Sequence, residues 1–165
     1  MPLSFQEFRA WEPHQQGRHE FLAGEVVAMT GTSDRHNTVS LNLAFALRER
    51  LRDGPCQVFM ADVMVRVEAA DAAFYPDVFV TCAEADRADP YVKREPSVVI
   101  EDKFDAYRRL PSLQEYILVD PERPRVEVFR RNPGGQWLVD TLGAGGTLRL
   151  GAPALEIPMT EIYRD

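Results

Sequence analysis

The sequence predicts a mixed α/β (α+β) fold in which helices accompany a β-sheet, within one domain spanning residues 1–165. Apolar residues recur at helical spacing over residues 34–53, several runs rich in Val and Phe lie between residues 57 and 101, and a strand–turn–strand pattern covers residues 125–142. With 165 residues, of which 45% are hydrophobic and 27% charged, the chain can bury a core without disulfides or metals.

The first element expected is a short helix. Residues 4–7 read Ser-Phe-Gln-Glu, a capping box in which the Ser hydroxyl and the Glu carboxylate satisfy free amides at a helix start. This helix should run to Trp11 and stop at Pro13. Residues 21–22 and 26–29 then form a hairpin whose turn uses a glycine.

The strongest helical pattern covers residues 34–53. Apolar side chains recur there every three or four residues, and a Gly-Pro pair ends the pattern. The residues of this stripe are Val39, Leu43, Ala46, Leu47 and Leu51. One face of this helix should therefore be buried.

Extended segments follow the long helix, separated by short polar turns. They are residues 57–60, 63–67, 74–81 and 97–101. Phe104, Tyr107 and Leu110 then repeat every three residues ahead of Pro111, which predicts a second core helix that begins near Asp102.

The last third of the chain reads as β-structure. A strand is expected at residues 115–119, and residues 125–131 and 136–142 form a hairpin joined by Asn-Pro-Gly-Gly. An exposed hairpin can pair with another subunit, so we expect a homodimer.

Composition and charge exclude several classes of protein. No apolar stretch approaches the roughly 20 residues that span a bilayer, so we expect no membrane contact and a cytoplasmic protein. A formal charge of −7 argues against a broad basic surface, so any nucleic-acid contact would have to be local. Cys56 and Cys82 show no metal-site or disulfide spacing, and we expect two buried thiols.

Two carboxylates stand in apolar strand-like runs, Asp77 in Tyr-Pro-Asp-Val and Glu101 at the end of Val-Val-Ile-Glu. An ionised carboxylate near a core costs several kcal/mol unless a partner or a metal balances it. Mg²⁺ or Mn²⁺ takes such oxygen ligands, and the two strands could be neighbours whose acids converge. Lys103 follows and could orient the attacking water or stabilise a transition state. The alternative is that these acids form ordinary surface salt bridges.

Six blocks of the chain, taken in order, resemble the successive motifs of the Uma2 family (DUF820). They are Arg-His-Glu-Phe-Leu-Ala-Gly-Glu-Val-Val at residues 18–27, Arg-His-Asn at 35–37, Tyr-Pro-Asp-Val at 75–78, Pro-Ser-Val-Val-Ile-Glu at 96–101, Lys-Phe-Asp-Ala-Tyr-Arg at 103–108 and Leu-Gln-Glu-Tyr-Ile-Leu-Val-Asp at 113–120. The likeness covers almost the whole chain, which makes it far more specific than any single motif.

The family is similar to restriction endonucleases of the PD-(D/E)xK type. The resemblance implies a mixed central sheet flanked by helices, a restriction-endonuclease-like core to which the C-terminal hairpin is added. It also implies a metal held by Asp77 and Glu101, with Lys103 as the catalytic lysine and Glu20 as an additional ligand or a nearby contact. DNA rather than RNA is the expected nucleic-acid partner.

One departure from the family pattern concerns the connection after Glu101. In the family a segment of roughly ten or more residues separates the strand glutamate from the helix lysine, whereas here Glu101 runs directly into Asp102 and Lys103. Either the loop is deleted, leaving a compact Glu-x-Lys, or a mobile loop is missing from the sequence as given. The helix start at Asp102 favours the second explanation.

Other polar residues have plainer interpretations. His36 could contact a phosphate, but a capping or packing role at the helix start is favoured, and His14 and His19 should be exposed. Asp62 should be a turn carboxylate, and Tyr107 a core aromatic that could also touch substrate.

The sequence thus predicts a metal-dependent endonuclease that hydrolyses phosphodiester bonds. Two alternatives stay open: a non-catalytic domain that keeps the fold for dimerisation or partner binding, and a different metal-dependent hydrolase on the same scaffold.

Overall fold

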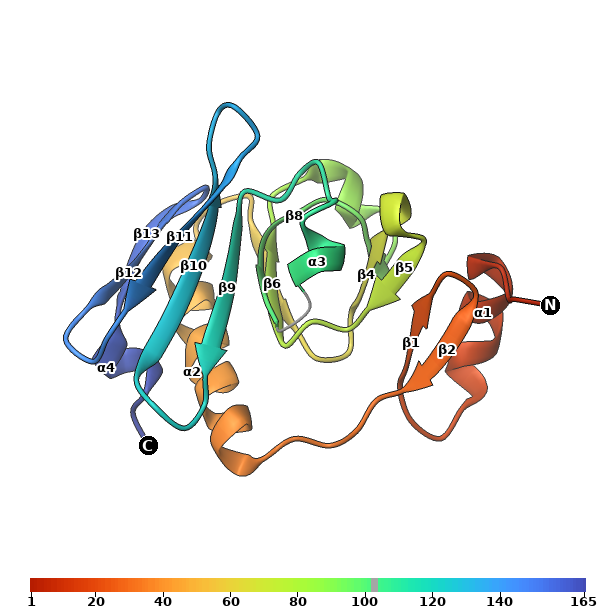
Figure 1. Cartoon of the computed structure of the whole chain (residues 1–165), viewed down its shortest axis with the longest axis horizontal. Helices are drawn as coiled ribbons and strands as arrows, with labels where there is room; N and C mark the ends of the chain where they lie inside the picture. Colours follow the sequence, from red (N-terminus) through yellow and green to blue (C-terminus); the bar gives the residue numbers. More distant parts are fainter. Residues whose placement is uncertain (102–103) are drawn as a thin grey trace.

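The computed structural model describes residues 1–101 and 104–165, and over these residues the chain forms three β-sheets with helices packed between and around them (Figure 1). The helices are α1 (Phe5–Trp11), η1 (Glu12–His14), α2 (Asp34–Leu51), η2 (Glu68–Ala70), η3 (Glu84–Arg87), α3 (Phe104–Tyr107) and α4 (Met159–Ile162). None of the helices in the described part of the chain is long and apolar enough to cross a membrane.

A six-stranded sheet in the order β11-β10-β9-β8-β6-β3 forms the centre of the molecule. Its strands are β3 (Gln57–Met60), β6 (Val78–Thr81), β8 (Pro96–Ile100), β9 (Glu115–Asp120), β10 (Arg125–Arg131) and β11 (Trp137–Leu142). β8 and β9 run parallel and the other neighbours antiparallel, so the sheet is mixed, as predicted.

Two smaller sheets complete the fold. A five-stranded sheet has the order β2-β1-β5-β4-β7, and a C-terminal hairpin pairs β12 with β13. These strands are β1 (His19–Leu22), β2 (Glu25–Ala28), β4 (Met64–Val67), β5 (Ala72–Phe74), β7 (Val92–Lys93), β12 (Thr147–Gly151) and β13 (Ala154–Pro158). The sequence patterns did not predict β7, β12, β13 or α4.

Both faces of the central sheet are buried at β6 and β8, because helices or strands cover each of them. Val78 and Ile100 pack in one core with Leu43 of α2 and with residues of the C-terminal hairpin and α4. Phe79 and Val99 point to the other face and pack in a second core with Tyr107 of α3 and with β4 and β5. α3 therefore lies between the six-stranded and five-stranded sheets (Figure 1).

The N-terminal predictions are confirmed at the level of single hydrogen bonds. Ser4 Oγ accepts from the Glu7 amide at 3.3 Å, and Glu7 Oε2 accepts from the Ser4 amide at 2.7 Å, which completes the capping box of α1. β1 and β2 form the expected hairpin, with positive φ at Ala23 and Gly24 in its turn.

Residues 74–81, expected as one strand, form two strands that belong to different sheets. β5 ends at Phe74 in the five-stranded sheet, and β6 begins at Val78 in the six-stranded sheet. Pro76 lies in the crossing segment, and a proline has no amide to donate to a sheet ladder. The break places Asp77 immediately before the first residue of β6.

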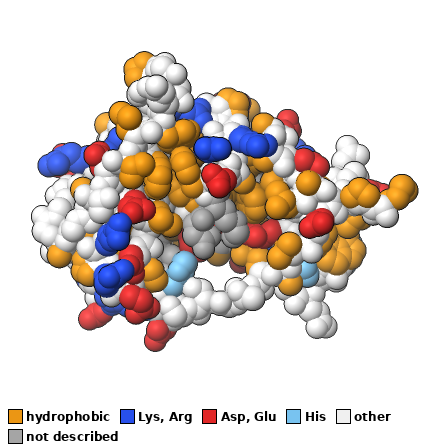
Figure 2. Space-filling view, in the orientation of Figure 1, with side chains coloured by type: hydrophobic (Ala, Val, Ile, Leu, Met, Phe, Trp, Pro, Cys, Tyr) orange, Lys and Arg blue, Asp and Glu red, His pale blue; other side chains and the backbone are white. Residues whose placement is uncertain are grey.

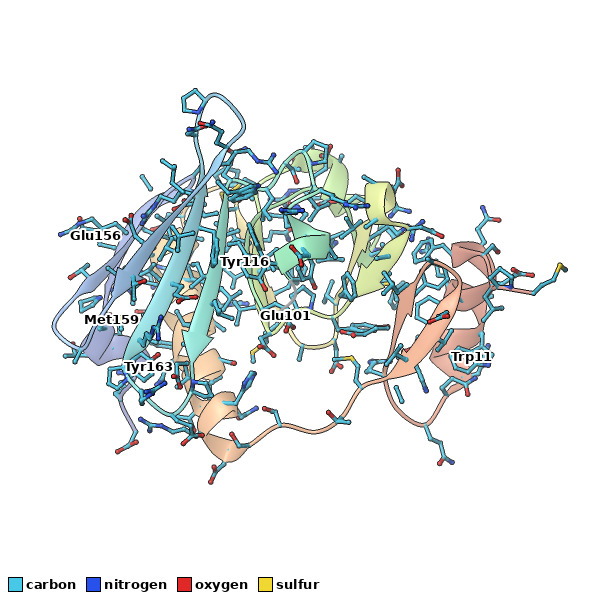
Figure 3. The ribbon with its side chains drawn as sticks, viewed as in Figure 1. Trp11, Glu101, Tyr116, Glu156, Met159 and Tyr163 are labelled. Carbon is cyan, nitrogen blue, oxygen red and sulfur yellow. A yellow bond between two sulfur atoms is a disulfide. The ribbon has the colours of Figure 1, made fainter. Side chains whose placement is uncertain are left out.

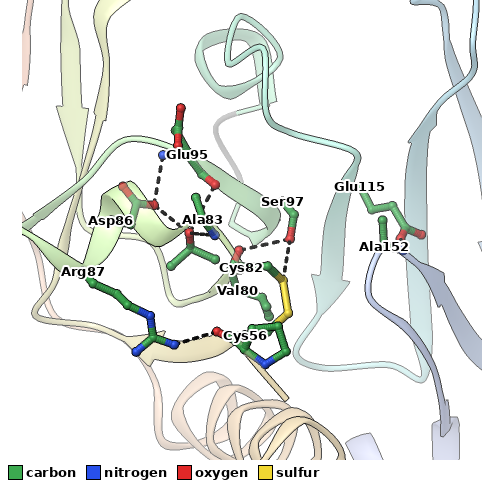
Figure 4. The surroundings of a disulfide bond; sticks show 12 residues. Cys56, Val80, Cys82, Ala83, Asp86, Arg87, Glu95, Ser97, Glu115 and Ala152 are labelled. Carbon is green, nitrogen blue, oxygen red and sulfur yellow. Dashed lines mark hydrogen bonds between the residues drawn. A yellow bond between two sulfur atoms is a disulfide. The ribbon is translucent and has the colours of Figure 1, made fainter.

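The expectation of two free thiols was wrong, because Cys56 and Cys82 form a disulfide with a Cα–Cα distance of 4.0 Å (Figure 4). β3 and β6 pair antiparallel with Gln57 opposite Thr81, so the two cysteines occupy the next register position beyond this pair. The sheet register therefore brings the two sulfur atoms together.

The predicted hairpin at the end of the central sheet is confirmed as β10 and β11. β11 is an edge strand of the six-stranded sheet, and its Leu138 and Val139 are 58% and 52% exposed.

Candidate metal centre

Asp77 and Glu101 meet at one edge of the central sheet. β6 and β8 pair antiparallel with Val78 opposite Ile100, so Asp77 and Glu101 occupy the next register position on the two chains. The prediction that their strands are neighbours is confirmed. The amide of Glu101 also donates to Ile117 O of β9 at 3.3 Å, which ties this end of β8 to the parallel strand beside it.

Both acids line a pocket of about 280 Å³ between the sheet edge and the first turns of α2. The wall formed by α2 includes His36, Ser40 and Leu43, and the end of β9 closes the opposite side. The side chain of Asp77 is 32% exposed, whereas Glu101 as a residue is 9% exposed. The pocket is therefore open to a ligand at Asp77 and closed by protein at Glu101.

His36 of α2 contacts Asp77 at the neighbouring sheet edge. Its Nε2 lies 2.9 Å from Asp77 Oδ2, in a close contact that lacks the alignment of a hydrogen bond. Its backbone amide donates to Ser33 Oγ at 3.1 Å, so the expected helix-capping geometry is also present. The sequence placed His36 correctly at the helix start, but the contact of its ring with Asp77 depends on how α2 docks on the sheet.

Glu20 lies on β1 in the five-stranded sheet, is 8% exposed, and does not line the pocket that holds Asp77 and Glu101. Within residues 1–101 and 104–165, no three His, Cys, Asp or Glu side chains are grouped so that they could hold one metal ion. The described structure therefore brings together two of the three acids that were expected as ligands.

Tyr107 of α3 is fully buried near these acids. Its hydroxyl has no hydrogen-bond partner in the described part of the chain. Burial raises the pKa of Tyr107 well above its ordinary value, and the negative charges of Glu101, Glu20 and Asp77 raise it further. The hydroxyl therefore stays protonated at neutral pH and remains available as a hydrogen-bond donor. Figure 3 shows Glu101 near the middle of the molecule, beside α3, with Tyr116 on β9.

Lys103 and Asp102 lie outside the described residues, and so does the connection in which the chain departs from the family pattern. Glu101, the last residue described before them, lines the pocket, and Phe104, the first described after them, begins α3.

The structure also tests the expectations for Asp62, His14 and His19. Asp62 is a turn carboxylate as predicted, with its Oδ1 3.2 Å from Arg18 Nε. His14 is exposed as predicted. The expectation for His19 was wrong, because its ring is partly buried and its Nδ1 lies 3.0 Å from Oε2 of the buried Glu12.

The donor set at the sheet edge suits a hard divalent cation. Mg²⁺ usually binds one or two protein carboxylates and completes its shell with water and substrate phosphate oxygens. Asp77 and Glu101 provide two such carboxylates at one edge, and the pocket leaves room for the remaining ligands. Figure 2 shows acidic side chains on this face, above a hollow bounded by the segment that joins β2 to α2.

A comparison with protein-family models identifies the family of the chain. The family model "Uma2: Putative restriction endonuclease" matches residues 5–160. Two uncharacterized proteins of Synechocystis sp., slr1290 and sll1609, are 29% and 30% identical to this chain; the first alignment covers 98% of this chain and 92% of the relative, the second 85% and 87%.

A crystal structure described as a putative nuclease belonging to DUF820, from Anabaena variabilis, superposes with a TM-score of 0.78 at 14% identity. The match covers 98% of each chain and shows that the fold is shared. Because the family model spans nearly the whole sequence, the chain belongs to the Uma2 family.

Proposed function

We propose that this protein is an endonuclease that uses Mg²⁺ or Mn²⁺ to hydrolyse phosphodiester bonds, with Asp77 and Glu101 as the metal ligands. The observation that carries the proposal is the position of these acids, directly beyond the paired residues Val78 and Ile100 and in one pocket. The nuclease descriptions of the family and of the solved structure support the same reaction class.

The reaction is the addition of water to phosphorus, cleavage of the bond to the leaving oxygen, and transfer of a proton to that oxygen. A bound divalent ion lowers the pKa of a water ligand and neutralises charge on the phosphate. Asp77 and Glu101 would hold the ion, whereas Glu20, buried on β1, does not line this pocket.

Three further residues have roles in the proposal. His36 positions the Asp77 carboxylate through its 2.9 Å contact. Tyr107 supplies a protonated hydroxyl beside the acids. Lys103 orients the attacking water or stabilises the charge that develops on the phosphate.

The expected substrate is a nucleic acid, with DNA preferred over RNA. The formal charge of −7 means that general attraction to a polyanion is weak, so binding must rely on local contacts around the pocket.

A cleavage assay tests the proposal. Purified protein is incubated with single- and double-stranded DNA and RNA, with Mg²⁺ or Mn²⁺ or with a chelator. We expect metal-dependent cleavage by the natural chain and at least a hundredfold loss in Asp77→Ala and Glu101→Gln. Asp53→Ala, which alters an aspartate whose side chain is 95% exposed, should cleave normally. Full activity in Asp77→Ala would reject the assignment.

A non-catalytic binding role is the second candidate, and one observation favours it. Leu138 and Val139 are exposed on the edge strand β11, and an edge strand can pair with another chain. We propose that this edge mediates a homodimer in either case. Light scattering should report twice the chain mass of 18.7 kDa, and Leu138→Lys should return the monomer.

A further inference from the structure

A second pocket, of about 550 Å³, lies on the N-terminal side of the molecule and shares no residue with the candidate metal centre. Its polar and aromatic lining consists of Arg9, Glu12, Arg18, Asp62, Tyr75 and Tyr91. These residues come from α1, η1, the residue before β1, the β3–β4 turn and the segments before β6 and β7. We refer to this site as the Tyr91 pocket.

The Tyr91 pocket adjoins the metal centre through the backbone. Tyr75 lines it and stands two residues before Asp77 in the chain. The amide of Ala61 donates to Asp77 O at 3.3 Å, and the next residue of that turn, Asp62, also lines the pocket. The backbone from Tyr75 to Asp77 therefore connects the linings of the two sites.

Both arginines that line the Tyr91 pocket are held in ion pairs. Arg9 Nη2 lies 2.8 Å from Asp89 Oδ2, and Arg18 Nε lies 3.2 Å from Asp62 Oδ1. Glu12 adds a buried carboxylate to the lining. A pocket in which each cation already has an acidic partner is poorly suited to a phosphate group, because no net positive charge remains to attract it.

The floor of the Tyr91 pocket is polar and held in place. Glu12 is 2% exposed, and its Oε1 accepts from the His19 amide at 2.8 Å and, more weakly, from the Tyr75 hydroxyl at 3.4 Å. The floor is therefore polar, with Glu12 and Tyr75 fixed by contacts to each other and to His19.

The rim presents flat surfaces to solvent. Tyr91 is 73% exposed, yet its backbone is fixed, because its amide donates to Asp89 Oδ1 at 2.9 Å and its carbonyl accepts from the Met64 amide at 3.1 Å. Elsewhere in the lining, the Arg18 guanidinium lies 5.5 Å from the centre of the Tyr75 ring. An aromatic ring and a guanidinium are both surfaces on which a planar ring stacks.

We infer that the Tyr91 pocket binds an unstacked nucleobase of the strand whose phosphate lies at Asp77 and Glu101. A nucleobase is planar, uncharged and edged with donors and acceptors, which matches the paired arginines, the polar floor and the flat rim. The volume falls within the ordinary range of small-ligand pockets, roughly 300–1,000 Å³. This inference rests on the proposed function and specifies its substrate as a strand with a free base, single-stranded or locally opened.

Anisotropy of a fluorescent single-stranded DNA, measured in the Asp77→Ala background with a chelator, tests the inference without cleavage. We expect Tyr91→Ala to weaken binding by about tenfold or more, as for loss of one base-stacking aromatic. Tyr91→Phe keeps the ring and should restore the affinity. Phe45→Ala is the control, because it removes a half-exposed aromatic on α2 that does not line the Tyr91 pocket. It should leave the affinity unchanged.

The possible outcomes separate the two proposals. If Tyr91→Ala binds single-stranded DNA normally while Asp77→Ala abolishes cleavage, the base pocket is overturned and the nuclease stands. If Tyr91→Ala weakens intact duplex and an all-abasic strand as strongly as single-stranded DNA, Tyr91 is a general surface contact and the inference is again overturned. If the natural chain neither cleaves nor binds nucleic acid, both proposals fail.

Discussion

His36 Nε2, on the first turn of α2, lies 2.9 Å from Oδ2 of Asp77 at the start of β6. The contact joins the helix that covers the central sheet to the edge where two acids meet. Each side chain is 32% exposed, so the pair lies at the mouth of the pocket rather than in the core. Its energetic contribution to folding should be small, and its effect on the orientation of Asp77 large.

Replacing His36 tests this positioning role. We expect His36→Ala to weaken Mn²⁺ binding by about 10- to 100-fold, the usual cost of losing a group that orients a metal ligand. The free energy of unfolding should change little. Calorimetric titration with Mn²⁺ measures the first quantity and urea denaturation the second. His14→Ala removes an exposed histidine and serves as the control; equal affinities in the two variants would refute the role of His36.

Two buried or half-buried tyrosines should respond in opposite ways to loss of the hydroxyl. The Tyr107 hydroxyl has no partner in the described part of the chain, whereas Tyr163 Oη donates to Asp120 O at 2.7 Å and accepts from the Arg125 amide at 3.2 Å. Tyr107→Phe should raise the free energy of unfolding by about 1 kcal/mol, and Tyr163→Phe should lower it by about 1–2 kcal/mol.

Denaturation of the two variants in parallel, without metal, checks this prediction. A loss of stability in Tyr107→Phe as large as that in Tyr163→Phe would mean that the Tyr107 hydroxyl is bonded in the metal-free protein.

The disulfide should contribute substantially to stability. It closes a loop with a sequence separation of 26 residues, for which the chain-entropy relation gives about 3–4 kcal/mol. Urea denaturation with and without a thiol reductant measures the difference, and Cys56→Ser with Cys82→Ser should match the reduced natural chain. An identical midpoint under both conditions would show that the bond does not form in solution. Disulfides are uncommon in reducing compartments, so the result also bears on where the protein works.

Titration at alkaline pH should reveal the raised pKa of Tyr75. Its pKa is raised from 10.0 to about 12 in the folded protein, chiefly by burial. Between these values the folded state keeps a proton that the unfolded state releases, so the stabilisation is complete below pH 10 and is lost as the pH rises toward 12. Absorbance titration of tyrosinate should show that Tyr75→Phe lacks one late-titrating group. Loss of a group that titrates near pH 10 instead would contradict the buried position.

Local sequence patterns predicted most of the elements of the fold, because each pattern is produced by contacts within one segment. The capping box at Ser4 fixed the start of α1, and the apolar stripe from Val39 to Leu51 identified α2. Asp77 and Glu101 could be found in the sequence because each stands in an apolar run. Their convergence follows from the antiparallel pairing of β6 with β8.

Features that depend on pairing between distant segments were missed. Cys56 and Cys82 meet because β3 pairs with β6, and the same register rule that aligns Asp77 with Glu101 aligns the sulfur atoms one strand away. The ring of His36 reaches Asp77 only because α2 docks over this sheet edge. The strand expected over residues 74–81 divides because the chain changes sheets at Pro76, a choice that local propensity does not record.

Titration with Mn²⁺ in a calorimeter tests the central claim most directly, with the natural chain, Asp77→Asn and Glu101→Gln compared at equal concentration. Asp53→Asn, remote and exposed, completes the set. We predict one ion per chain for the natural protein and for Asp53→Asn, and no measurable binding for the two pocket variants. Unchanged binding in both Asp77→Asn and Glu101→Gln would show that this sheet edge is not the metal site.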